Sequence, residues 1–240
     1  MAEWYPSTEQ ELNKLVTYLI SNKPKIKLKS SQIHGIIVPH AGYAYSGEIA
    51  GEAFSLLKQI NPKIKKAIII GPSHYTPLKG IASLEISSTP LGQVNIIKNQ
   101  FPKIPYEHSI QNQIPFLQKL NTNIQILPLV IGNINEAQAK EIANMININY
   151  KDYFIIISTD LSHFLPYNEA RQKDENTLKI ISQLDLKQAK NIDACGIYPL
   201  LVFMHLAKQN NWHPKLIEYK NSGDITGDKS QVVGYSSWVF

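Results

Sequence analysis

The sequence places a histidine within a few residues after each of three short apolar segments. These pairs are residues 36–38 with His40, residues 67–70 with His74, and residues 154–158 with His163. Imidazole nitrogens bind metal ions and transfer protons near neutral pH. Because histidines placed at random would rarely fall in this way, we interpret the three as parts of one site.

The elements around these histidines predict how they come together. Short all-apolar strands alternate with amphipathic helices, which indicates an α/β fold with a mostly parallel sheet and helices on both faces. In such sheets ligands bind outside the carboxyl ends of the strands. The expected helices are an opening one capped by Ser7 or Thr8, and then residues 46–58, 109–120, 135–147, 167–184 and 197–209.

The end of the chain predicts a different strand arrangement. Residues 214–219 and 232–240 are predicted to form the last two strands, and the turn-rich Asn221-Ser222-Gly223-Asp224 lies between them. This connection is too short for a crossover helix, so we expect an antiparallel C-terminal pair. The sequence shows no internal repeat and no linker, and residues 1–240 are predicted to form a single three-layer domain.

Cys195 and Asp160 are two further candidate site residues. Cys195 lies just before the predicted helix 197–209, where the helix dipole favours a thiolate that can bind metal or act as a nucleophile. Asp160 lies between a predicted strand and His163. Each residue also has an ordinary interpretation, since loop histidines often only hydrogen-bond turns and a lone cysteine is often a small core side chain. His108, beside Glu107, is a weaker candidate that lines the cleft.

The composition excludes several classes of protein. The chain of 240 residues carries a net charge of +5, but its lysines are scattered and arginine is nearly absent, which favours a solvated surface over nucleic-acid binding. One cysteine rules out an internal disulfide. The apolar runs are far shorter than the roughly 20 residues that span a bilayer, and no secretory signal is visible, so we expect a cytoplasmic protein without membrane contact.

Several segments together resemble the Memo family, also known as protein B of the AmmeMemoRadiSam system. They are VPHAGYAYSG (38–47), IIIGPSHY (68–75), EHSIQNQIPFL (107–117), LPLVIGN (127–133), STDLSHF (158–164), the Cys195-Gly196 step and VVGYSSWVF (232–240). The resemblance extends from His34 to the end of the chain, with the motifs in the expected order.

The resemblance implies a phosphorylase/dioxygenase-like fold, similar to that of the class III extradiol ring-cleavage dioxygenases. Those enzymes hold a non-heme iron with two histidines and a glutamate. The corresponding positions here are His40 and His74, with Cys195 in place of the carboxylate. A thiolate shifts the preference toward softer metals, so the implied cofactor is iron or copper, with zinc as a further option. Asp160 and His163 stand where the dioxygenases carry an additional ligand and an acid/base histidine.

Three functions remain open at this point. The first is a metal-dependent redox enzyme in which Asp160 and His163 are catalytic. The second is a non-catalytic module that binds a peptide or small molecule in the former dioxygenase cleft, as the phosphotyrosine-binding adaptors among vertebrate relatives imply. The third is nucleophilic catalysis by Cys195, which lacks an oxyanion-hole signature in the sequence.

Overall fold

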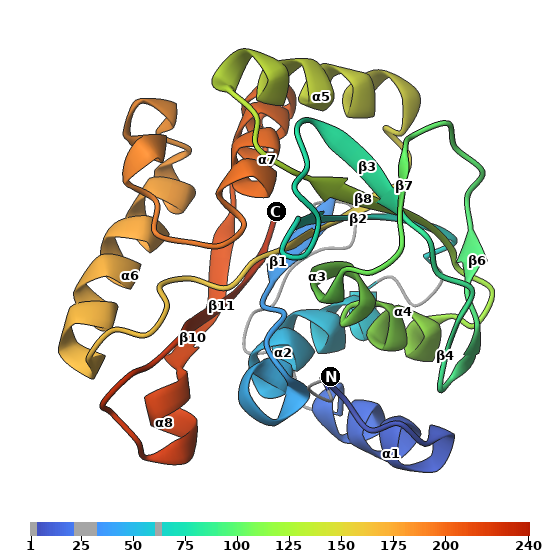
Figure 1. The fold of residues 1–240 in the computed structure, drawn as a ribbon, viewed down its shortest axis with the longest axis horizontal. Coiled ribbons are helices and arrows are strands. Elements are labelled where there is room, and N and C mark those ends of the chain that lie inside the picture. Colours follow the sequence, from blue (N-terminus) through green and yellow to red (C-terminus); the bar gives the residue numbers. More distant parts are fainter. Residues whose placement is uncertain (1–3, 22–32, 61–63) are drawn as a thin grey trace.

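The computed structural model describes residues 4–21, 33–60 and 64–240, and its elements are labelled in Figure 1. The helices are α1 (Glu9–Leu19), α2 (Tyr43–Ile60), α3 (His108–Gln111), α4 (Ile114–Leu120), α5 (Glu136–Asn149), α6 (Tyr167–Gln183), α7 (Ile197–Asn210) and α8 (Ser222–Thr226), with a 3-10 helix at Leu186–Asn191. The strands are β1 (Gly35–Val38), β2 (Lys66–Pro72), β3 (Ile81–Leu84), β4 (Ser88–Thr89), β5 (Gly92–Gln93), β6 (Asn95–Ile96), β7 (Lys103–Ile104), β8 (Gln125–Ile131), β9 (Phe154–Ser158), β10 (Lys215–Asn221) and β11 (Gly234–Val239).

The main sheet of the described residues runs in the order β10-β11-β1-β9-β2-β8-β3-β7, with β6 also paired to β8. Its central strands β1, β9, β2 and β8 are parallel, and Ile156 lies between Ile36 on one side and Ile69 on the other. Strands that are covered on both faces need apolar side chains in both directions, which explains their continuous Ile-rich runs. This arrangement brings the residues after β1, β2 and β9 to one edge of the sheet.

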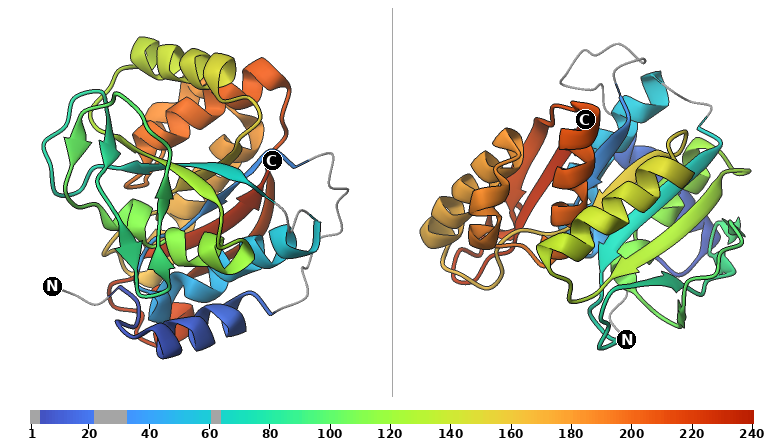
Figure 2. Two further views of the ribbon diagram at one scale, coloured as in Figure 1. Left: turned by 90° about the vertical axis from the view of Figure 1, so that its right-hand side faces the viewer. Right: turned by 90° about the horizontal axis from the view of Figure 1, so that it is seen from above.

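Helices cover both faces of this sheet, as predicted (Figures 1 and 2). On one face α1, α2 and α4 form a core with Ile36, in which the rings of Phe54 and Phe116 stack with centroids 4.6 Å apart. On the other face α5, α6 and α7 form a core that includes Ile37 and Phe203. Neighbouring residues of one strand thus enter opposite cores, which fixes the strand register.

The two ends of the sheet are antiparallel. β10 and β11 pair in this way, which confirms the prediction for the C-terminal strands, and β11 also pairs antiparallel with β1. At the opposite end β3 is antiparallel to β8 and carries β7 in parallel. The sequence predicts no strand between β2 and residue 109, because β3 to β7 are only two to four residues long and partly polar.

The predicted helix at residues 109–120 is two helices in the structure. α3 begins at His108 with Glu107 as its N-cap, and α4 begins at Ile114 with a proline in its first turn. Pro115 is tolerated there because the first N–H groups of a helix have no internal partner. The break lets α3 sit against the end of β2, where it meets the other histidines.

Of the scattered lysines, Lys23, Lys25, Lys27, Lys29 and Lys63 lie outside the described residues. Among the helices that the structure describes, we find none with the length and apolar character needed to cross a membrane.

Candidate metal centre

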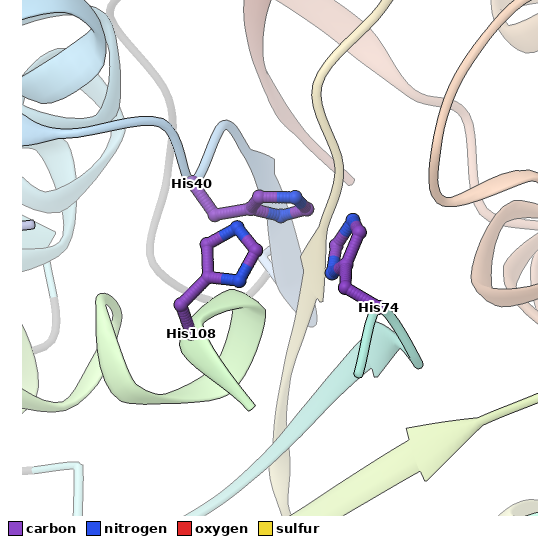
Figure 3. Close-up of side chains that lie close together, drawn as sticks. All are labelled: His40, His74 and His108. Carbon is purple, nitrogen blue, oxygen red and sulfur yellow. The ribbon is translucent and has the colours of Figure 1, made fainter. Parts of the chain in front are cut away.

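Three histidines meet at the carboxyl edge of the central strands (Figure 3). His40 follows β1, His74 follows β2 and His108 is the first residue of α3. One nitrogen of each ring lies within 4.8 Å of one nitrogen of the others, and the ring centroids are 4.5–5.2 Å apart. The cluster can hold a metal ion, since imidazole nitrogens are common ligands of transition metals.

His40 is the buried centre of the site, with only 1% of its surface exposed. Its Nδ1 lies 3.0 Å from the Ser158 hydroxyl, which itself donates to the carbonyl of Ser109. The Ser158 oxygen is therefore free to accept the proton of Nδ1, and the lone pair of His40 Nε2 faces the site. Burial, followed by the neighbouring His108 and His74, holds the pKa of His40 well below its ordinary value, so the ring is neutral and able to bind metal.

A buried glutamate organises the other two histidines. Oε1 of Glu107 lies 2.8 Å from His74 Nδ1 and 3.3 Å from His108 Nδ1. Burial acts to raise the pKa of Glu107, but the His108 and His74 side chains and the N–H of His74 outweigh it and hold that pKa well below its usual value. The His74 side chain is 26% exposed, so the cluster opens toward solvent on this side.

Cys195 contacts the cluster through His40. Its Sγ lies 3.3 Å from His40 Nε2 and accepts a hydrogen bond from the N–H of Asp160, also at 3.3 Å. The expected thiolate is not favoured here, because burial and the Asp160 carboxylate raise the pKa of the thiol. Gly196 is the N-cap of α7, so Cys195 precedes the helix, and desolvation outweighs the helix dipole.

Asp160 and His163 emerge after β9 at the same edge. Oδ1 of Asp160 accepts from the backbone N–H of His40 at 2.7 Å, and its Oδ2 is 4.0 Å from His40 Nε2. Burial raises the pKa of Asp160. His163 is half-buried beside the exposed ring of Phe164.

The structure thus brings His40 into contact with both other predicted ligands, His74 and Cys195, but does not bring those two against each other. His40 contacts both the other histidines and Cys195, whereas the contacts of the Cys195 side chain are with His40, Thr159 and Asp160. His74 instead pairs with His108, which sequence reasoning had ranked below the rest. His34 lies at the opposite end of β1, stacked on Trp212 with centroids 4.8 Å apart.

Sequence reasoning missed the groups that surround His108. The Trp4 indole stacks on the His108 ring at 4.0 Å and donates to the Tyr106 hydroxyl at 2.9 Å. Glu107 was noted only as a neighbour of His108. The sequence does carry one signal, the acidic residue directly before a helix that begins with histidine. Such a residue can cap the helix and also bind the imidazole of that histidine.

The fold and the cluster define the class of this protein: a mixed α/β domain with a candidate histidine metal centre at the carboxyl edge of its parallel strands. A family model described as Memo-like protein matches residues 2–239. The chain belongs to the Memo family.

Curated relatives agree with this assignment over nearly their whole length. A MEMO1 family protein of Aquifex aeolicus is 35% identical over 99% of this chain and 96% of its own. Those of Sulfolobus acidocaldarius (35% identical, 85% of this chain and 81% of its own) and Archaeoglobus fulgidus (33%, 88% of each) are similar.

Proposed function

We propose that this chain is a metal-dependent redox protein that binds iron or copper between His40, His74 and His108, with Cys195 as an additional ligand. The observation that carries the proposal is the convergence of three imidazoles, each from a different element, within 4.8 Å. His40 and His74 are the two predicted histidine ligands, and His108 joins them.

The spacing of the donor atoms supports a shared ion. Ligands at roughly 2.0–2.3 Å from one tetrahedral ion lie about 3.4–3.7 Å from each other. Sγ of Cys195 and Nε2 of His40 are already 3.3 Å apart. On metal binding the imidazole nitrogens, which lie within 4.8 Å of one another, would need to close to these distances, a change of roughly 1–1.5 Å for the most widely separated pair.

The donor types support a redox-active or soft metal. Imidazoles suit zinc, copper and iron, and a thiolate adds preference for copper and zinc. When bound, iron or copper would supply one-electron chemistry, whereas zinc would supply only a Lewis acid. The carboxylate beside His40 is Asp160, and its Oδ1 accepts from the backbone N–H groups of His40 and Ala41. We therefore assign it the role of orienting His40.

His163 is proposed as the proton-transfer residue. It follows β9 at the same edge of the sheet and is half-buried, so it is open to solvent, unlike the enclosed His40. Imidazole side chains serve as general acids and bases in many enzymes. The substrate is proposed to be a small molecule or peptide that enters beside His74, where Tyr75 is 50% exposed.

Metal content and oxygen consumption test this proposal together. Protein purified without metal-affinity resin or chelator is analysed for metals, loaded anaerobically with Fe²⁺ or Cu⁺, and then exposed to air. Wild type is expected to bind about one ion and to consume oxygen faster than His74→Ala and Cys195→Ala. Equal background binding and equal rates in all three would overturn the proposal and favour a peptide- or small-ligand-binding module.

A further inference from the structure

The Glu107 carboxylate is fully buried and accepts hydrogen bonds on both oxygens. Its Oε2 accepts from the backbone N–H of His74 at 2.6 Å. Its Oε1 lies 2.8 Å from His74 Nδ1 and accepts from the N–H of Ser109 at 3.0 Å. One carboxylate thus binds His74 at two points, the main-chain N–H and the ring.

We infer that Glu107 is a positioning residue that holds His74 with its proton on Nδ1 and the lone pair of Nε2 turned toward the cluster. Both oxygens of Glu107 already accept from main-chain N–H groups, so the carboxylate is the acceptor and His74 Nδ1 is the donor in their contact. The two-point attachment also restricts rotation of the ring. The role in metal binding rests on the proposed function, whereas the state of the His74 ring does not.

The same contacts argue against Glu107 as a metal ligand. The carboxylate holds the buried N–H groups of His74 and Ser109, and moving it onto an ion would leave these donors without a partner. The N-cap of α3 would be lost as well. The donors beside His40 and His74 therefore come from His108 and Cys195, and Glu107 contributes a charge outside the ligand set.

Glu107 also lies against both His74 and His108. Nδ1 of His108 lies 3.3 Å from the same Oε1, without a hydrogen bond of its own. The Trp4 indole stacks on one face of the His108 ring. His74 and His108 are thus both held against one carboxylate, which keeps their rings 4.5 Å apart.

Histidine ring NMR and Co²⁺ titration test this inference. Long-range ¹H–¹⁵N spectra of the metal-free protein near pH 8 report which ring nitrogen of His74 carries the proton. The test variant is Glu107→Gln, because a glutamine has one acceptor oxygen and must turn its NH₂ group against a donor. The control is Glu136→Gln, the same change at an exposed position in the first turn of α5.

We expect wild type and the control to show the Nδ1–H form of His74, and Glu107→Gln to lose it. Co²⁺ affinity should fall about 10–100-fold in Glu107→Gln alone. An Nε2–H form of His74 in wild type would overturn the inference, as would a folded Glu107→Gln with unchanged ring state and affinity. If wild type shows the expected ring state but binds no Co²⁺, the proposed metal function fails while the positioning of His74 by Glu107 stands.

Discussion

Nε2 of His40 lies 3.3 Å from Sγ of Cys195, although 155 residues separate them in the sequence. β1 delivers the imidazole and the loop before α7 delivers the thiol, so the contact depends on the whole fold. The Ser158 hydroxyl contacts Nδ1 of His40, and the N–H of Asp160 donates to Sγ of Cys195. These contacts leave Nε2 of His40 and Sγ of Cys195 facing each other.

Removal of the thiol should change the spectrum of a bound metal without abolishing binding. We expect wild type loaded with Co²⁺ to show thiolate-to-metal charge-transfer absorption, and Cys195→Ala to lose it while keeping the weaker bands of a histidine-bound ion. Affinity should drop by at least about tenfold, because a thiolate is a strong ligand. If Cys195→Ala and wild type give the same spectrum, Cys195 is not a ligand.

The Cys195 thiol of the metal-free protein should react slowly at neutral pH. Burial and Asp160 raise its pKa, so less of it is thiolate at neutral pH than in an ordinary cysteine, which has a pKa of about 8.5. The rate of alkylation by iodoacetamide should therefore still rise with pH where the urea-unfolded protein has levelled off. A plateau below neutral pH in the folded protein would contradict this pKa shift.

The Ser158 hydroxyl should be needed for both stability and metal binding. It contacts His40 Nδ1 and Gln113 Nε2 and donates to Ser109, so Ser158→Ala leaves several buried polar groups without a partner. We expect a loss of about 1–3 kcal/mol in the free energy of unfolding, measured by urea denaturation, and weaker Co²⁺ binding. Ser88→Ala at an exposed position is the control, and an equal effect of both changes would argue against this role.

The Asp174 carboxylate lies so close to the backbone of Gly234 that this position should not accept a side chain. A Cβ at this position would lie 2.1 Å from Oδ2 of Asp174, a buried carboxylate that accepts from the N–H of Ser162 next to His163. Gly234→Ala should cost roughly 1–3 kcal/mol in unfolding free energy and displace the loop that carries His163.

The matched change for this test is Gly42→Ala. Its added Cβ would meet its nearest neighbour at 3.6 Å, an ordinary contact, so we expect less than about 0.5 kcal/mol. If Gly234→Ala is as stable as Gly42→Ala, the loop can move to accept the added side chain, and the prediction is wrong.

The sequence predicted the parts of the site that depend on local pattern. Ile-rich runs identify the central strands, and parallel strands must end at one edge, so His40 and His74 could be placed together. His108 could not be ranked with them, because its position depends on how the short strands β3 to β7 return the chain to that edge. The protonation of Cys195 was also out of reach, since its burial beside Asp160 is a product of the tertiary structure.

Diffraction from crystals of the metal-loaded protein, collected at the absorption edge of the metal, tests the central claim most directly. The account predicts one anomalous peak between His40, His74 and His108, with nitrogen ligands at roughly 2.0–2.1 Å and, for a bound thiolate, Cys195 Sγ at about 2.3 Å. A peak ligated elsewhere on the protein, or fully loaded crystals with no peak at this cluster, would contradict it.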